Sequence, residues 1–258
     1  MLFLFIYLRF AKKRYDICLF LIKNNMKKII LLLILCISNG VFSQNYDISP
    51  DQLFNSGNVI IQSLMKYDGN ARGNPYQDKD FFEGKLFFDN GKIYKALIRL
   101  NVSEQKFEIK KDINSTPSAI KIDQTVKVNI GKASYKLHSF NLGSSTNTIG
   151  ILEECLILDK YSLFYFPQKK LEMPNKTAIP APTSGYTKPP RPEWRDNSAY
   201  LIFYNNKTYK LPTSHKKMMD LGLFDEKLYK KYRKANKLNL KNKESLKGLI
   251  TYFNSLDS

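Results

Sequence analysis

The chain has 258 residues, 43% of them hydrophobic, which is enough to bury one large core or two small ones. It carries 41 Lys and Arg against 23 Asp and Glu, a formal charge of +18 at pH 7. With only three cysteines and two histidines, the composition argues against a disulfide scaffold and against a zinc site built on histidines.

Residues 26–43 have the three-part layout of a secretory signal peptide. Two lysines follow Met26, an apolar run occupies 29–37, and Ser43 supplies a small residue before the expected cut. The run is shorter than the roughly 20 residues that span a bilayer. We therefore expect a mature chain from Gln44 that is periplasmic or secreted from a Gram-negative cell, with no membrane span.

Residues 1–25 are apolar but interrupted by charges, and we interpret them as a doubtful extension produced by a misplaced start. A second transmembrane element is the alternative. Cys36 raises the question of a lipoprotein, which the large Leu35 before it disfavours. Removing residues 1–43 takes away seven basic residues and one acid, which lowers the formal charge from +18 to +12.

The same cleavage leaves Cys155 as the one remaining cysteine, so the mature chain has no internal disulfide. Cys155 lies in the apolar run 151–158, which predicts a buried strand. A reactive thiolate needs exposure and a cationic neighbour, so we interpret Cys155 as a structural thiol.

The first clear structural signal is residues 81–111, which predict three successive strands with Asn90-Gly91 as a type I′ turn between the first two. Upstream, 51–54 and 59–65 hint at a short helix and a strand. Alternating apolar and polar residues continue through 106–110 and 126–130, as in a sheet with one wet face.

Residues 149–158 and 161–166 are apolar at both odd and even positions, apart from two glutamates. They predict a central hairpin that is buried on both faces and turns at Asp159-Lys160. Residues 81–170 are thus expected to form a single antiparallel sheet, either curled, closed into a sandwich, or bent into a half-barrel.

The segment 172–194 is rich in proline, which excludes a continuous ladder of strand hydrogen bonds. We expect an extended loop, laid across the sheet by Tyr186 and Trp194. A further hairpin is predicted around Asn205-Asn206, since asparagine tolerates the left-handed conformation.

The tail, residues 212–258, is predicted to form two or three short helices that pack on the β-rich domain 44–211. Asp225 is the expected N-cap of one helix, with Leu228, Tyr232 and Ala235 on its apolar face. Asn242 is the expected N-cap of another, whose apolar residues are Leu246, Leu249, Ile250 and Phe253. The predicted fold class is α+β, mainly antiparallel sheet with C-terminal helices.

This order of elements resembles a group of uncharacterised exported β-rich proteins common in the Bacteroidota. The resemblance covers about residues 75–256 and rests on the stretches 82–101, 158–163, 209–221, 232–238 and 249–254. The group's usual Arg-Tyr-Asn at the end of the second strand is here Arg99-Leu100-Asn101, a partial match. The resemblance implies export and assigns no residue a role.

Enzyme signatures are missing from the sequence, which has no GxSxG elbow, no Gly-rich phosphate loop and no HExxH. We interpret His138 as a surface imidazole on a strand, and His215 as the solvated start of a helix. Glu153 and Glu154 point to opposite faces of a strand, so they do not form a glycosidase pair, and we interpret them as strand-edge charges.

Two further charged features flank the first strands. Asp78, Lys79, Asp80 and Glu83 form an acidic-rich patch that is too short to show a calcium loop. Arg99, within the second strand, is interpreted as a wet-face charge or an ion-pair partner.

The basic tail is the strongest charge feature. From Asn205 onward there are thirteen Lys and Arg against five Asp and Glu, so +8 of the expected +12 lies there. In an exported protein this suggests an anionic envelope component as partner, while a solvated lysine-rich face is the alternative. The candidate anion-binding residues are Lys230, Lys231, Arg233, Lys234 and Lys237.

Three functions are compatible with these patterns. The first is an exported, non-catalytic structural or binding module of the cell envelope. The second is an anion- or glycan-binding protein that uses the basic helices, and the third is a hydrolase with scattered carboxylates and no recognisable motif. No catalytic, metal or cofactor residue is nominated, and no specific nucleic acid partner is expected.

Overall fold

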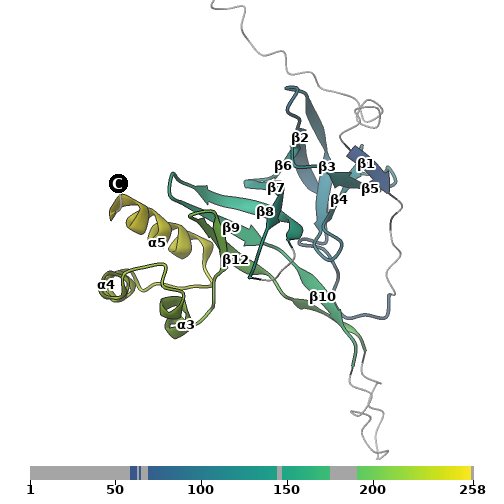
Figure 1. Cartoon of the computed structure of the whole chain (residues 1–258). Helices are drawn as coiled ribbons and strands as arrows, with labels where there is room; N and C mark the ends of the chain where they lie inside the picture. The colour runs from purple at the N-terminus through teal and green to yellow at the C-terminus, as the bar shows by residue number, and fades with distance from the viewer. Residues whose placement is uncertain (1–58, 63, 65–68, 144–146, 175–190, 257–258) are drawn as a thin grey trace, which may run out of the picture. The chain divides into compact units, whose positions relative to one another are not determined.

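The fold is described from a computed structural model, which covers residues 59–62, 64, 69–143, 147–174 and 191–256. Over these residues the chain has the predicted α+β fold, an antiparallel sheet with three C-terminal helices (Figure 1). All of them belong to one compact unit, Tyr46–Ser258. The predictions for residues 1–43, for a helix at 51–54 and for Tyr186 lie outside the described residues.

Eleven strands join into one sheet and two more form a separate ladder, all by antiparallel pairing. Along the chain they are β1 (Val59–Gln62), β2 (Phe82–Phe87), β3 (Ile93–Asn101), β4 (Lys106–Lys110), β5 (Ser118–Ile122), β6 (Lys127–Ile130), β7 (Ala133–Phe140), β8 (Thr148–Ile157), β9 (Tyr161–Phe166), β10 (Lys169–Glu172), β11 (Glu193–Asp196), β12 (Ala199–Tyr204) and β13 (Lys207–Lys210). The order in the sheet is β1-β5-β4-β3-β2-β6-β7-β8-β9-β12-β13.

Most neighbours in the sheet are consecutive along the chain, as expected when short turns join antiparallel strands. The exception that shapes the sheet is β6, which returns to pair with β2 after the β2–β5 meander. The result is one curled half-barrel, so the sandwich alternative is wrong.

The turn between β2 and β3 is not the predicted type I′. Only Gly91 has a positive φ, of 78°, and its N–H donates to the carbonyl of Phe88 at 3.0 Å. The connection is thus a type I turn followed by a left-handed glycine, the three-residue hairpin loop. Asn90 uses its side chain instead, accepting a hydrogen bond from the N–H of Lys92 at 3.0 Å.

The β8–β9 hairpin lies inside the sheet between β7 and β12, as its apolar sequence predicts. Only its middle is buried on both faces, however. Ile149 and Ile157 near the two ends of β8 are 63% and 56% exposed. Both ends of β8 are therefore exposed to solvent, and the prediction that the whole hairpin is buried on both faces was too broad.

The two ends of the proline-rich segment pair with each other in a short antiparallel ladder, which the proline content did not predict. β10 pairs with β11, and Leu171 lies opposite Trp194. Trp194 therefore belongs to a strand paired with β10, and not to the predicted extended loop. The prolines at 174 and 192 flank the ladder, where they remove no strand hydrogen bond.

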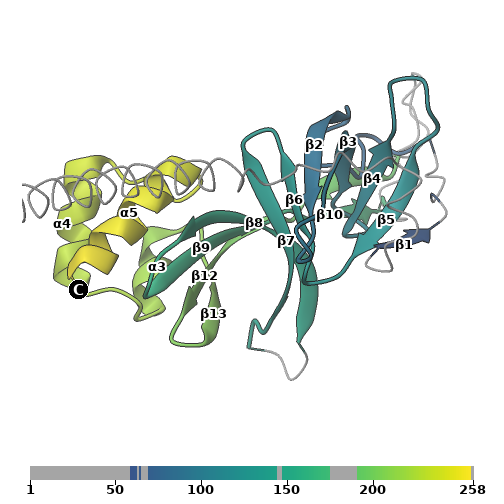
Figure 2. The same ribbon diagram turned by 90° about the horizontal axis from the view of Figure 1, so that it is seen from above.

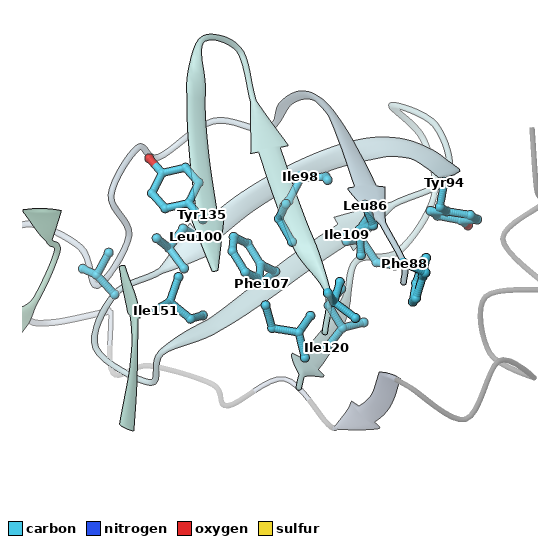
Figure 3. Packing of buried hydrophobic residues seen from close by; sticks show 14 residues of the cluster. Leu86, Phe88, Tyr94, Ile98, Leu100, Phe107, Ile109, Ile120, Tyr135 and Ile151 are labelled. Atoms are coloured by element: carbon cyan, nitrogen blue, oxygen red, sulfur yellow. The ribbon is translucent and has the colours of Figure 1, made fainter. Parts of the chain in front are cut away.

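Two apolar clusters share one face of the sheet. The first lies under β2 to β8 and includes Leu86, Ile98, Phe107, Ile120 and Ile151 (Figure 3). The second lies under β9, β12 and the helices. A third, smaller cluster around Leu152 and Phe164 buries the opposite face of the central strands.

The helices are α3 (His215–Asp220), α4 (Glu226–Asn236) and α5 (Lys243–Leu256). They gather at the β9–β12 end of the sheet, where α5 contacts β8 and β9 (Figure 2). The four apolar residues predicted for α5 are all buried. On α4 the prediction holds in part, because Ala235 is exposed while Leu228 and Tyr232 are half-buried.

Candidate functional site

Helix α4 carries the candidate anion-binding residues, and its ends are fixed by local chemistry. The Asp225 carboxylate accepts a hydrogen bond from the N–H of Leu228 at 2.9 Å, which confirms the predicted N-cap. The helix ends at Lys237, whose φ of 48° and ψ of 49° are left-handed. Its N–H and that of Leu238 both donate to the carbonyl of Arg233.

The inner face of α4 is anchored by Tyr229, the one fully buried residue of the helix. The Tyr229 hydroxyl lies 2.8 Å from Nδ1 of His215, the first residue of α3. His215 is thus half-buried and partnered, which corrects its interpretation as a solvated helix start. Burial, assisted by the charge of Arg233, lowers the pKa of His215 below its usual value.

The candidate residues, Lys230, Lys231, Arg233, Lys234 and Lys237, are all exposed. The first four lie on α4 and Lys237 is its C-cap, and Arg233 follows Tyr229 by one turn, at the edge of the solvent-facing surface. Lys230 forms an ion pair with Glu226 one turn earlier. Within the part of the chain described here, the other four form no ion pair. The structure therefore brings the predicted residues together on one solvent-facing surface, called the α4 basic face below.

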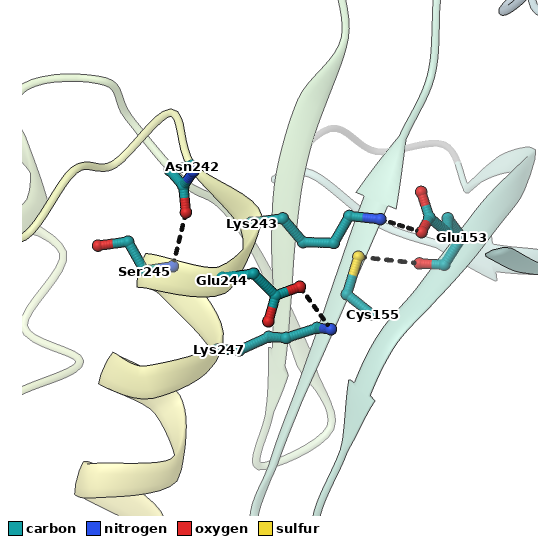
Figure 4. Close-up of polar contacts among 7 residues, drawn as sticks. All are labelled: Glu153, Cys155, Asn242, Lys243, Glu244, Ser245 and Lys247. Atoms are coloured by element: carbon teal, nitrogen blue, oxygen red, sulfur yellow. Dashed lines mark hydrogen bonds and ion pairs between the residues drawn. The ribbon is translucent and has the colours of Figure 1, made fainter. Parts of the chain in front are cut away.

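A second charged feature was not foreseen from sequence. Glu153 on β8 is only 6% exposed and is bonded to Lys243 at the start of α5 (Figure 4). Burial alone would lower the pKa of Lys243, but the hydrogen bond and the charge of Glu153 raise it above its usual value. Glu153 is therefore not a strand-edge charge, because it joins the centre of the sheet to α5.

Glu153 stands in a row of tyrosines that runs across four strands. Directly paired neighbours place Tyr135, Glu153, Tyr165 and Tyr200 side by side on the face that carries α5. The rings of Tyr165 and Tyr200 lie 5.0 Å apart. Burial raises the pKa of all three tyrosines, that of Tyr200 to about 12. The row is a polar seam between the two apolar clusters.

Cys155 lies beside this seam, half-buried, with its Sγ 3.7 Å from the carbonyl oxygen of Glu153. Burial, and then the charge of Glu153, raises the pKa of the thiol to about 12. Such a thiol stays protonated at neutral pH and is a poor nucleophile. The interpretation as a structural thiol therefore agrees with its surroundings.

Glu154 points to the opposite face, as its position next to Glu153 requires. Its carboxylate lies 3.0 Å from Nζ of Lys127 and 3.9 Å from Nε2 of His138. His138 is not the predicted surface imidazole, because its ring packs against those of Phe164 and Phe203. Burial lowers the pKa of His138, against the opposing charge of Glu154. No nucleophile lies within hydrogen-bond distance of the imidazole among the described residues.

Arg99 is an ion-pair partner, the second of its two predicted roles. Its Nη2 lies 2.6 Å from Oε2 of Glu108, which is 2% exposed. The guanidinium is packed between the rings of Tyr76 and Phe81, 3.7 and 4.3 Å from their centroids. The ion pair joins β3 to β4, and the cation–π contacts hold Tyr76 and Phe81 against the guanidinium of Arg99, whose side chain is 16% exposed.

The acidic-rich patch lies at the surface, before and at the start of β2. Asp78, Lys79, Asp80 and Glu83 are all exposed. The carbonyl oxygen of Lys79 accepts a hydrogen bond from Arg99. Across the described residues, no group of three or more His, Cys, Asp or Glu is placed to hold a metal ion.

A cavity of about 560 Å³ on the outer face of β2 and β3 is lined by Lys85, Lys95 and Lys111 together with Glu83. Lys85 and Lys95 are directly opposite each other on the two strands, a like-charge pair that destabilises the hairpin. The cavity adds to the basic character of the molecule but holds none of the candidate residues.

Within the described ranges, no helix is both long enough and apolar enough to span a membrane. Comparison of the chain with protein-family models, with curated proteins and with solved structures found no match.

Proposed function

We propose that this protein is an exported, non-catalytic binding module of the cell envelope, and that the α4 basic face holds an anionic envelope component. The observation that carries the proposal is that all five candidate residues are exposed on α4 and its C-cap, and four of them have no acidic partner in the described chain. Solvent-facing cations of this density attract polyanions and raise their local concentration.

Export rests on the signal-peptide layout of residues 26–43 and on the resemblance to exported Bacteroidota proteins. Both are properties of the sequence. The proposal of a non-catalytic role is supported by the surroundings of two titratable groups. The carboxylate of Glu153 is paired with Lys243, and burial raises the pKa of the Cys155 thiol, which keeps it protonated.

Lys237 gives the proposal an independent argument. A left-handed residue after a helix is usually glycine, since a side chain there is strained. Lysine at this position keeps a positive charge on the α4 basic face in spite of that strain. Residues held in sparsely populated conformations cluster at functional sites. The alternative is that Lys237 has no role in binding and only complements the negative C-terminal end of the α4 dipole.

The test is binding of a fluorescein-labelled heparin dodecasaccharide, followed by anisotropy at about 150 mM NaCl. The double reversal Lys231→Glu with Lys234→Glu is expected to weaken binding at least tenfold, about 1.4 kcal/mol. The matched control is Lys121→Glu with Lys132→Glu, two exposed lysines elsewhere, which changes the net charge by the same amount. Equal loss in both variants would show that bulk charge, not the α4 basic face, binds the polyanion.

Lys237→Gly separates binding from stability. It removes a charge and relieves the left-handed strain, so the free energy of unfolding should stay the same or rise by up to about 1 kcal/mol. Heparin binding should nevertheless weaken. Unchanged binding would assign Lys237 to helix termination alone.

A further inference from the structure

The cavity of about 560 Å³ on the outer face of β2 and β3 is built from several parts of the sheet. Strands β2 and β3 supply most of its lining, Lys111 comes from the segment after β4, and Asn129 and Gly131 come from β6 and the turn after it. Its volume lies within the roughly 300 to 1000 Å³ typical of small-molecule sites. Strand pairing fixes the backbone of β2, β3 and β6 relative to one another.

The strand register places three polar side chains in one row across β3, β2 and β6. Lys95 is directly opposite Lys85, and Lys85 is directly opposite Asn129. All three line the cavity, and both lysines are exposed. Directly paired residues project from the same face, with Cβ atoms roughly 4.5–5.5 Å apart. One small ligand can therefore reach both ammonium groups and the amide.

The positive charge of this cavity is not neutralised by the protein. Lys85 and Lys111 form no ion pair within the described part of the chain, and neither does Glu83, the carboxylate of the lining. Like charges directly opposite each other, such as Lys85 and Lys95, destabilise a sheet. An anion between the ammonium groups removes this repulsion, so its relief adds to the free energy of binding.

Asn129 and Glu83 indicate a second property of the ligand. The Oδ1 of Asn129 is buried and has no hydrogen-bond partner among the described residues. The amide can turn toward a ligand without breaking a hydrogen bond of that oxygen, and an unbonded buried acceptor costs free energy. An amide oxygen and a carboxylate both accept, so their partner must donate, as a hydroxyl does. The lining thus suits an anion that also carries hydroxyl groups.

A phosphomonoester has the charge and the acceptors that the lysines require. It carries about −1.5 to −2 charges at pH 7 and has three strong acceptor oxygens, which match the three ammonium groups of the lining. Lysine binds phosphate as a compact point charge, without the fixed fork of arginine. When the ester is formed with a sugar, the remaining hydroxyls supply the donors for the amide and the carboxylate.

We propose that this cavity binds a small phosphomonoester that carries hydroxyl groups, of the sugar phosphate class. Lys85, Lys95 and Lys111 contact the phosphate, and Asn129 and Glu83 accept hydrogen bonds from the hydroxyls. None of the residues of the α4 basic face lines the cavity. The two sites are therefore independent, and failure of heparin binding at α4 leaves this proposal standing.

The test is isothermal titration of the full chain with glucose 6-phosphate, inorganic phosphate and glucose at about pH 7.5. Glucose 6-phosphate is expected to bind with a Kd below about 1 mM. Inorganic phosphate should bind at least about threefold more weakly, and glucose should give no heat up to about 10 mM. Lowering the pH to about 5 should weaken binding, because the second pKa of the phosphate is about 6.

Lys85→Gln separates a binding role from a structural one. It should weaken glucose 6-phosphate binding at least about fivefold. Without ligand it should raise the melting temperature by about 1–3 °C, because the repulsion with Lys95 is relieved. The matched control is Lys121→Gln, an exposed lysine of β5 outside the cavity, which should keep the affinity within about twofold.

Four results would overturn the proposal. The first is no binding of glucose 6-phosphate up to about 10 mM, and the second is equal weakening by Lys85→Gln and Lys121→Gln. Equal affinity for inorganic phosphate and glucose 6-phosphate would remove the role of the hydroxyls. Tighter binding to vesicles containing phosphatidic acid than to glucose 6-phosphate would assign the phosphomonoester to a lipid and not to a small soluble ligand.

Discussion

At the scale of single residues, the decisive contact is the ion pair between Glu153 and Lys243. A carboxylate in the middle of a sheet is costly unless it is paired, and here the partner comes from a helix 90 residues further along the chain. The pair lies in the polar seam, so it fixes where the start of α5 docks at the edge of the second apolar cluster. The ion pair therefore positions α5 on the sheet as well as stabilising the folded state.

Lys243→Met should lower the free energy of unfolding by about 2 kcal/mol. Breaking a buried pair typically costs more, roughly 3–5 kcal/mol, but the Lys243 side chain is 36% exposed, so solvent screens part of its charge. Urea unfolding at pH 7 measures the difference. Lys247→Met is the control, since its partner Glu244 is mostly exposed and the loss should be within about 0.5 kcal/mol.

The same pair predicts a pH dependence. The folded-state pKa of Lys243 is raised, so the stabilisation is complete below the unfolded pKa of about 10.4 and is lost as pH rises through the folded value. The gap between wild type and Lys243→Met should therefore be constant from about pH 7 to 10 and shrink above that range. A gap that widens at high pH would contradict this sign.

At the scale of elements, the starts of helices α4 and α5 are determined by hydrogen bonds between residues close in sequence. Asp225 and Asn242 stand directly before α4 and α5, and each accepts a hydrogen bond from the N–H three residues on. These caps and the apolar spacing of α5 are visible in the sequence because a helix is a local structure. The sequence did not determine the turn type at Gly91, since Asn-Gly is compatible both with a type I′ turn and with the three-residue hairpin loop.

Asp225→Ala should cost about 1 kcal/mol of unfolding free energy, because the N–H of Leu228 loses its acceptor. Asp225→Asn keeps an acceptor oxygen and should lose only a few tenths of a kcal/mol, about 0.3. Thermal unfolding followed by circular dichroism at 222 nm measures both variants. Equal losses would mean that charge at the helix start matters and the cap hydrogen bond does not.

At the scale of the whole molecule, net charge opposes compactness. The formal charge is +18 for the chain and +12 without residues 1–43, so the folded state repels itself more than the expanded one. Several of the ion pairs that salt would weaken in the described part of the chain are exposed, so each adds little to stability.

Raising NaCl from about 20 mM to about 500 mM should therefore increase the urea midpoint of unfolding, because the Debye length falls from about 20 Å to about 4 Å. The charge-matched variant pairs of the heparin experiment should show a smaller increase than wild type, since two Lys→Glu changes lower the net charge of each by four. A midpoint that falls with salt would show that the ion pairs outweigh the self-repulsion.

The sequence by itself determined the antiparallel character of the sheet, the hairpins, the capped helices and the exposed basic residues of α4. Each of these features depends on residues close together in the chain. Apolar residues recur with a period of two in strands and 3.6 in helices, and turn and cap residues mark where these elements end. It also indicated that Glu153 and Glu154 face opposite ways, which the contacts with Lys243 and Lys127 confirm.

Only the tertiary structure decided what those residues meet. The pairing of β6 with β2 and the seam that joins Tyr135 to Tyr200 both unite segments distant in sequence. Burial and the shifted pKa values depend on such long-range contacts, because a side chain's surroundings are set by strands and helices that its own neighbours do not specify. For this reason Glu153, taken from sequence as a strand-edge charge, proved to be buried, and His138, taken as a surface imidazole, proved to be half-buried.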